Sequence, residues 1–268
     1  DQIRIIYAYA NMFSRKNEKE AVYFYKICAN DSIKSDTNFT KGIYDYGCML
    51  YEGNEIPINK KEAAKYFKEA ADNGYIDAMY NYGFMLYESE ATQIDKKEAS
   101  KYLKEAADKG NIKAMNKYAF MLKCGHGIPI DKKEAAKYFK EAANKGNINA
   151  MFNYALMLKC GDGIPIDKKE AAEYYKKAAD NGDFKSMYNY GCMLDRGDGI
   201  PIDKKEAAKY LKEVADNGSI RAMHKYGCML YEGDGIPIDK KEAAKYLKDA
   251  SDKGNVNTIK ALDINMKY

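Results

Sequence analysis

The sequence repeats itself every 36 residues, and six consecutive copies contain no insertion. One position of the copy holds glycine throughout and another holds leucine. The glycines are Gly74, Gly110, Gly146, Gly182, Gly218 and Gly254, and the leucines are Leu50, Leu86, Leu122, Leu158, Leu194 and Leu230. A period of this length is typical of repeat proteins, whose units bury their apolar faces only against neighbouring units. The spacing therefore predicts one elongated array with a continuous core.

Each copy contains a helix that begins at a capping box. In the copy that starts at Asp131, the Asp131 carboxylate is predicted to accept the backbone N–H of Glu134, while Glu134 reaches back to the start of the helix. Gly146 is expected to end this helix in a left-handed conformation. The apolar stripe between these two ends has helical period and comprises Ala135, Tyr138, Phe139, Ala142 and Ala143.

A second helix follows, so that the unit is predicted to be a helix-turn-helix hairpin. Asn147 is a good N-cap residue, as are Asp183 and Ser219 at the same position of the next two copies. The apolar stripe of this helix comprises Met151, Tyr154, Ala155 and Leu158. Small residues in both stripes predict a close approach of the two helix backbones, with aromatic residues filling the space between layers.

The hairpin is expected to continue into the next copy through a turn. Gly161 and Gly163 permit tight backbone turns, and Pro165 stiffens the path into the next capping box. Ile164 and Ile166, on either side of the proline, are expected to be apolar anchors.

The third copy breaks this turn pattern. Residues Glu88 to Gln93 contain neither glycine nor proline. The preceding helix is therefore expected either to continue by a turn or to be followed by a mobile loop. Two explanations remain open for the change, namely drift without selection and an acidic contact site on one rim.

Three segments of one copy show the pattern most completely. They are Ala150-Met-Phe-Asn-Tyr154-Ala155, Gly161-Asp-Gly163-Ile-Pro and Asp167-Lys-Lys-Glu-Ala171. This pattern resembles the Sel-one-like repeat family, a relative of the tetratricopeptide repeat, over about residues 42 to 257. The resemblance implies an all-α fold, a right-handed α-solenoid superhelix of helix-turn-helix repeats, and a role as an adaptor without catalysis.

The array is expected to form one continuous solenoid domain with three parts. Residues 1–41 are interpreted as a degenerate N-terminal repeat, residues 42–254 as six Sel-one-like repeats, and residues 255–268 as a C-terminal capping helix. The chain begins at Asp1 without methionine. We interpret this start as that of a fragment or processed product, from which an upstream domain is missing.

The resemblance implies that the first helix of each pair lines a concave side, where partner proteins or peptide segments bind. One row of residues there is mostly aromatic and comprises Tyr44, Tyr80, Asn116, Phe152, Tyr188 and His224. Neighbouring charges are acidic in the early copies (Asp45, Glu52, Asp77, Glu88) and basic in the later ones (Lys113, Lys117, Lys123, Lys185, Arg196, Arg221, Lys225).

These residues predict a groove with an acidic front half and a basic rear half. Such a charge gradient would orient an extended peptide and speed its capture. The alternative interpretation is an ordinary solvated surface in a chain rich in lysine and tyrosine. The candidate partner-binding residues are Tyr44, Tyr80, Phe152, Tyr188, His224, Lys113, Lys117, Arg196, Arg221 and Lys225.

Composition argues against several classes of function. The 44 basic residues are nearly matched by 40 acidic ones, and a net charge of +4 does not favour nucleic-acid binding. No apolar run approaches the roughly 20 residues that a membrane-spanning helix needs. His126 and His224 are the only histidines. We expect no catalytic residue, metal or cofactor.

The six cysteines are expected to be reduced thiols of a cytoplasmic protein. Cys48, Cys192 and Cys228 share one position of the repeat, Cys124 and Cys160 share another, and no regular copy contains two. Equivalent positions of stacked hairpins lie roughly 10 Å apart, which is too far for a disulfide. Cys124, His126 and Cys160 do not have a recognised zinc-ligand spacing.

The sequence thus favours a cytoplasmic, non-catalytic scaffold or adaptor in signalling, which binds other proteins. One alternative is a structural component of a large assembly, such as a cytoskeletal array. Another is a quality-control adaptor in the lumen of the endoplasmic reticulum, for which Asn30, Asn38 and Asn217 match the glycosylation acceptor pattern.

Overall fold

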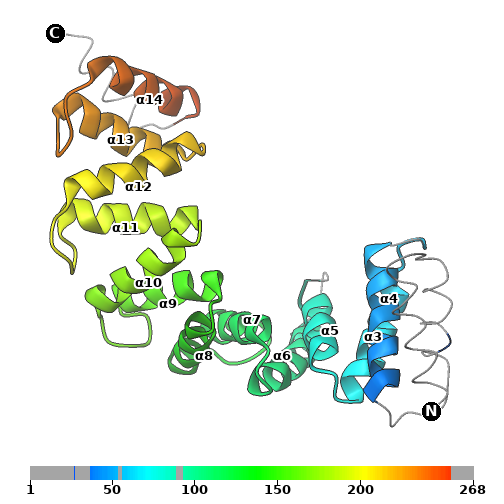
Figure 1. Ribbon diagram of the computed structural model, residues 1–268. Helices are drawn as coiled ribbons and strands as arrows, with labels where there is room; N and C mark the ends of the chain where they lie inside the picture. The colour runs from blue at the N-terminus through cyan, green and yellow to red at the C-terminus, as the bar shows by residue number, and fades with distance from the viewer. Residues whose placement is uncertain (1–26, 28–36, 54–55, 89–92, 255–268) are drawn as a thin grey trace. The chain divides into compact units, whose positions relative to one another are not determined.

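The computed structural model describes residue 27 and residues 37–53, 56–88 and 93–254 (Figure 1). Twelve helices, α3 to α14, follow one another in this part of the chain, which contains no strand. Their bounds are α3 Thr37–Glu52, α4 Lys60–Asp72, α5 Ile76–Glu88, α6 Gln93–Asp108, α7 Ile112–Cys124, α8 Lys132–Asn144, α9 Ile148–Cys160, α10 Lys168–Asp180, α11 Phe184–Arg196, α12 Lys204–Asp216, α13 Ile220–Glu232 and α14 Lys240–Asp252. Consecutive helices pack in pairs, which confirms an all-α solenoid of helical hairpins.

The chain divides into two units, residues 1–138 and residues 139–268, with the boundary inside α8. The predicted capping helix at residues 255–268 lies outside the described residues, as does most of the predicted degenerate repeat at residues 1–41.

The second helices begin at side-chain caps, although only half of the predicted capping box is present. The Asp131 carboxylate accepts the Glu134 backbone N–H at 2.8 Å, as predicted. The backbone N–H of Asp131 donates to the Leu122 carbonyl at 2.9 Å, and the Glu134 carboxylate accepts from Lys137 at 2.7 Å instead of reaching back. The cap residue thereby ties the loop to the last turn of the preceding helix.

The junction between α8 and α9 confirms the predicted glycine cap and N-cap. Gly146 has a φ of +93°, a conformation that residues with a Cβ rarely adopt. Its N–H donates to the Ala143 carbonyl at 3.0 Å, which satisfies one of the free carbonyls at the helix end. The Asn147 side chain then accepts the Ala150 backbone N–H at 2.9 Å and starts the next helix.

The core consists of the predicted stripes. Met151, Tyr154, Ala155 and Leu158 are all buried. Small residues allow the two helices of a pair to approach closely, because a Cβ added to Gly83 would lie only 3.2 Å from the Ala99 carbonyl oxygen. A tyrosine from each helix fills the remaining space, as where Tyr82 meets Tyr102 edge to face with ring centroids 4.9 Å apart.

The exit turn corrects the prediction that Ile166 is an apolar anchor. The side chain of Ile166 is 62% exposed, although its Cγ1 leans over Gly161. Polar contacts hold the turns instead. The Asp167 backbone N–H donates to the Leu158 carbonyl at 3.0 Å, and in the next turn Asp198 pairs with Lys168 at 2.7 Å.

The third copy extends the second helix and not the first. α5 ends at Glu88 with 13 residues, the same length as most other first helices. α6 begins at Gln93, three residues before the equivalent of Lys60 in α4. Proline occupies the equivalent of Gln93 in the other copies, where the second helix begins three residues later. Residues 89–92, where a mobile loop was the alternative, lie outside the described residues.

A hydrogen bond repeated every 36 residues ties successive second helices together. The Tyr102 hydroxyl donates to the Asp72 carboxylate at 2.6 Å, and Lys68 donates to the same hydroxyl at 3.0 Å. We call this row the tyrosine seam. Its other members are Tyr138 to Asp108 at 2.5 Å, Tyr174 to Asn144 at 2.7 Å, Tyr210 to Asp180 at 3.2 Å, and Tyr246 to Asp216.

Candidate functional site

In each unit a hollow opens on first helices within the described residues. The front hollow, in residues 1–138, has a volume of about 230 Å³ and lies between α3 and α5. It is lined by Cys48, Tyr51, Glu52, Phe67, Tyr80, Asn81, Phe84 and Met85. The rear hollow, in residues 139–268, has a volume of about 410 Å³ and lies between α11 and α13. It is lined by Tyr188, Asp195, Arg196, Arg221, His224, Lys225, Cys228, Met229, Glu232 and Asp234.

The two hollows share six positions of the repeat, four copies apart. Met85 of the front hollow corresponds to Met229 of the rear hollow. The other positions differ in chemistry: Tyr51 corresponds to Asp195, Glu52 to Arg196, Tyr80 to His224, Asn81 to Lys225 and Phe84 to Cys228. Equivalent backbone positions of the repeat thus carry different side chains in the two hollows.

Aromatic packing builds the front hollow. Phe67 forms its floor and is only 1% exposed. Tyr80 and Phe84 stack on one wall, with ring centroids 5.8 Å apart. The Tyr44 hydroxyl accepts a hydrogen bond from the Asn81 amide at 3.2 Å, and its ring lies 5.7 Å from that of Phe67. The predicted contact residue Tyr44 therefore supports the wall from behind.

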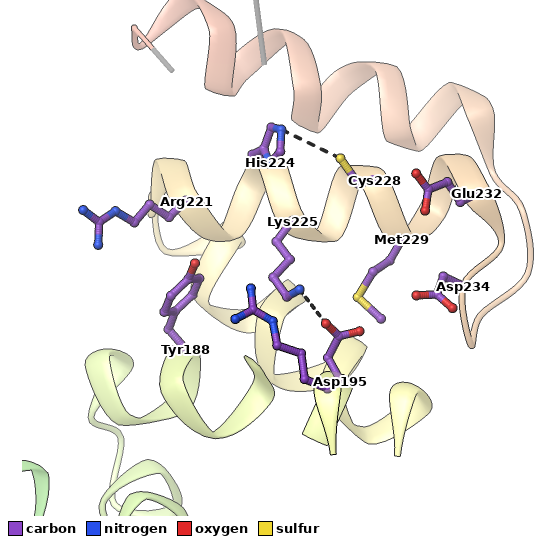
Figure 2. A pocket seen from close by; sticks show the side chains of 10 residues that line it. Tyr188, Asp195, Arg221, His224, Lys225, Cys228, Met229, Glu232 and Asp234 are labelled. Carbon is purple, nitrogen blue, oxygen red and sulfur yellow. Dashed lines mark hydrogen bonds and ion pairs between the residues drawn. The ribbon is translucent and has the colours of Figure 1, made fainter. Parts of the chain in front are cut away.

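Charged side chains line the rear hollow, and two arginines remain without an ion pair (Figure 2). Lys225 of α13 pairs with Asp195 of α11 at 2.5 Å. Asp234 is held by Lys204. Arg196 and Arg221 are exposed, and neither forms an ion pair within the part of the chain that the structure describes.

The equivalent cysteines Cys48 and Cys192 have neighbouring charges of opposite sign. Burial raises the pKa of both thiols, that of Cys48 to about 11. The carboxylates of Asp45, Glu52 and Asp77 raise the pKa of Cys48 further. The cations that surround Cys192, which are Lys225, Arg196 and Lys159, act in the opposite direction and lower its pKa. The charges near Cys48 thus add to the effect of burial, whereas the charges near Cys192 oppose it.

A second pair of equivalent residues, Tyr44 and Tyr188, shows the same contrast in neighbouring charge. Burial is the largest cause that raises the pKa of Tyr44 and of Tyr188. The charge of Asp77 raises the pKa of Tyr44 further, whereas Arg221 and Arg196 both lower that of Tyr188. Both arginines thus act on one half-buried hydroxyl in the rear hollow.

The histidines make packing contacts. Burial, and then the charge of Lys225, lowers the pKa of His224, so its imidazole is neutral at pH 7. The Nδ1 atom of His126 lies 2.8 Å from the Tyr87 hydroxyl. Within the described ranges no group of three His, Cys, Asp or Glu side chains could hold a metal ion.

The structure brings half of the predicted contact residues together. Five of them line the rear hollow, namely Tyr188, Arg196, Arg221, His224 and Lys225, and Tyr80 lines the front one. Phe152 packs against Tyr175 with ring centroids 5.9 Å apart, and Lys117 pairs with Glu88 at 3.1 Å above the Phe84 ring. Lys113 is exposed. Sequence reasoning missed Tyr51, Phe84, Asp195 and Glu232, which the same repeat register could have found.

None of the helices in the described ranges has the length and apolarity needed to cross a membrane.

Comparison with known proteins supports the repeat assignment. A family model described as the Sel1 repeat matches residues 6–30, 40–75, 76–111, 112–147, 148–183, 184–219 and 220–255. No curated protein matches the chain.

Two solved structures share this architecture. The crystal structure of c5321, a protective antigen of uropathogenic Escherichia coli strains with an SLR fold, superimposes with a TM-score of 0.79 at 26% identity over 87% of this chain. The chain spans 50% of the length of c5321. A Sel1 repeat protein from Oxalobacter formigenes superimposes with a TM-score of 0.73 at 23% identity, over 97% of this chain and 75% of that one.

Proposed function

Because the chain belongs to the Sel1 repeat family, we propose that it is a non-catalytic scaffold that binds segments of other proteins on its first helices. The observation that carries this proposal is the pair of hollows, which use the same repeat positions with different side chains. Packing of the buried stripes maintains the helical hairpins, whereas the residues that line the hollows vary without disturbing that packing. A surface of this kind can be specialised for partners, one hollow at a time.

The side chains of the hollows fit a role in recognition. Tyrosine and arginine are favoured as interface anchors, because they combine a large contact area with directional hydrogen bonds. Tyr80, Tyr188 and Arg221 are of these types and lie in the hollows. Half-buried aromatic rings also lose little conformational freedom on binding, which favours affinity.

Site-specific photo-crosslinking tests the proposed face. A photoreactive amino acid is placed at Phe84, at Tyr188 or, as a control, at the exposed Lys137 of a second helix. We expect partner proteins to be captured from the first two positions and not from the third. Equal capture from all three, or capture from Lys137 alone, would show that the first helices are not the binding face.

We place the protein in the cytoplasm with reduced cysteines, which would suit the exposed Cys124 and Cys160. The alternative in the endoplasmic reticulum requires glycosylation at its acceptor sites. Asn217 lies at the C-cap of α12 and its side-chain amide donates to the Glu213 carbonyl at 2.8 Å, so a glycan there would disturb a helix end. A shift in electrophoretic mobility after glycosidase treatment would contradict the cytoplasmic assignment.

A structural role in a larger assembly is the second candidate function, and one observation favours it. Large apolar side chains stand exposed at the same position of successive copies, namely Ile58, Ile130, Ile166, Ile202 and Ile238, each at 61–62%. Exposed apolar residues that recur in register favour lateral association. Sedimentation of the protein and of a variant with these isoleucines changed to serine would decide: a monomer in both cases excludes self-assembly through this row.

A further inference from the structure

Arginine is rare in this chain and is concentrated in the rear hollow. Four of the 44 basic residues are arginines, and the two in the described part of the chain, Arg196 and Arg221, both line that hollow. The guanidinium group differs from the lysine ammonium in its planar fork, which binds a carboxylate through two parallel hydrogen bonds. Two arginines beside one hollow therefore indicate an anion with directional acceptors.

The other charges of the hollow do not satisfy these arginines. Asp195 and Asp234 are paired with Lys225 and Lys204. Figure 2 shows Arg221 near Tyr188 at one end of α13 and Glu232 near its other end. Since the nearby carboxylates are engaged elsewhere or lie at the far end, the cationic end lacks a counter-charge.

Tyr188 completes the cationic end of the hollow. Its half-buried ring offers apolar contact, and both arginines act on its hydroxyl. A bound carboxylate would accept hydrogen bonds from the guanidinium groups and the hydroxyl, while the methylene groups above it would contact the ring. Glutamate and aspartate side chains have this chemistry.

A single negative charge suits the hollow better than a phosphate. Arg196, Arg221 and Lys225 balance Asp195, Glu232 and Asp234 among the residues that line it, so a group with nearly two negative charges would leave a larger net negative charge there than a carboxylate does. The neutral imidazole of His224 adds no positive charge to offset that excess. This balance of charges favours a carboxylate over a phosphate at the end where the two arginines lie.

We infer that the rear hollow binds a glutamate or aspartate side chain of a partner segment through Arg196 and Arg221. This inference rests on the proposed scaffold function and names the partner chemistry that one of its hollows selects.

Nuclear magnetic resonance of the arginine side chains tests the inference directly. The full chain gives four Nε–H signals, and the variants Arg196→Lys and Arg221→Lys assign the two of interest. The probe is a short capped Gly/Ser peptide with a central glutamate, and the matched peptides carry glutamine, lysine or phosphoserine instead. We expect the glutamate peptide to shift the Arg196 and Arg221 signals saturably and the glutamine and lysine peptides to leave them unchanged.

Substitutions separate the two arginines from general charge attraction. Arg196→Gln and Arg221→Gln should each weaken glutamate-peptide binding about five- to tenfold, the loss expected for an exposed charge-assisted hydrogen bond. Lys185 is exposed and lies at the position of Arg221 one copy earlier, so Lys185→Gln removes the same charge outside the hollow. It should weaken binding less than about twofold, because screened charges at a distance contribute little. Circular dichroism confirms that each variant is folded.

Three outcomes would overturn the inference. They are equal losses from Lys185→Gln and Arg221→Gln, equal binding of the glutamine and glutamate peptides, and tighter binding of the phosphoserine peptide. If the peptides fail while photo-crosslinking from Tyr188 still captures partners, the carboxylate site is wrong and the scaffold function stands. If the glutamate peptide binds but crosslinks form only from second helices, the scaffold proposal fails separately.

Discussion

The front and rear hollows are the same construction with different walls. Phe67 of the front unit and Leu211 of the rear unit occupy one repeat position and are both almost completely buried. The charge is reversed at two other repeat positions, because Glu52 and Asp77 of the front unit are replaced by Arg196 and Arg221 in the rear unit. The comparison shows that packing fixes one part of the repeat and leaves the neighbouring part free to vary. Substitutions can test this division.

The largest expected effect is on the floor of the front hollow. Phe67→Ala should lower the free energy of unfolding by about 3–4 kcal/mol, because it removes a buried ring and leaves a cavity. Urea unfolding followed by circular dichroism measures the change. Phe84→Ala in the half-buried wall is the control and should cost only about 1 kcal/mol. Equal losses of unfolding free energy in the two variants would contradict the view that Phe67 is fixed by packing and Phe84 is free to vary.

Reversing the charge of Arg196 and Arg221 should reverse the preference of the rear hollow for the glutamate peptide over the lysine peptide. Arg196→Glu with Arg221→Asp introduces the residue types found at the equivalent positions of the front unit, Glu52 and Asp77. We expect the glutamate peptide to bind at least about tenfold more weakly and the lysine peptide to gain affinity, because like charges repel where opposite charges attracted. The side chains of Arg196 and Arg221 are exposed, so the unfolding free energy should change by less than about 0.5 kcal/mol. An unchanged peptide preference would contradict the role of these walls.

The tyrosine seam is common to both units and should respond independently of the walls. Tyr102→Phe removes the hydrogen bond to Asp72 and should cost about 1 kcal/mol in urea unfolding. Tyr118 is the control, because it meets the seam residue Tyr138 edge to face and donates no hydrogen bond within the described residues. Tyr118→Phe should therefore be nearly neutral. If the two variants lose stability equally, ring packing and not the hydroxyl carries the seam.

The smallest expected effect is on the thiol pKa values of Cys48 and Cys192, which respond to the charges around them. Their thiol pKa values are measured from the pH dependence of alkylation rates. Since carboxylates surround Cys48 and cations surround Cys192, Glu52→Gln should lower the pKa of Cys48 and Arg196→Gln should raise that of Cys192. The midpoint of the pH profile separates this effect from differences in thiol access. If the two pKa values shift in the same direction, the charges around Cys48 and Cys192 do not act with opposite sign.

Much of the fold follows from local chemistry that the sequence displays. The caps at Asp131, Gly146 and Asn147 depend on residues within three positions, and the structure has them where they were predicted. Ile166 was wrongly assigned as an anchor because hydrophobicity alone does not tell a buried side chain from one that covers a glycine. The extra turn of α6 begins at Gln93, where the other copies have proline, and the pattern did not reveal on which side of the loop the helix would grow.

The candidate site was predictable in outline only. The periodicity located the row of Tyr80, Tyr188 and His224 on the first helices. It could not show that Phe152 packs against Tyr175 or that Lys117 pairs with Glu88, because these contacts depend on the spacing between neighbouring helices. Whether a charged residue remains unpaired is a property of three-dimensional neighbours. Arg196 and Arg221 are therefore distinguished from the many lysines only by the structure.

The tyrosine seam has a consequence for how such a chain can grow. Every bond in it spans thirty residues, so each copy offers the same donor to the copy before it and the same acceptor to the copy after it. A gene duplication or deletion of one 36-residue block would recreate an identical junction at the splice point. The length of the array can then change in single steps during evolution, and each added block brings a further set of first-helix positions whose side chains are free to diverge.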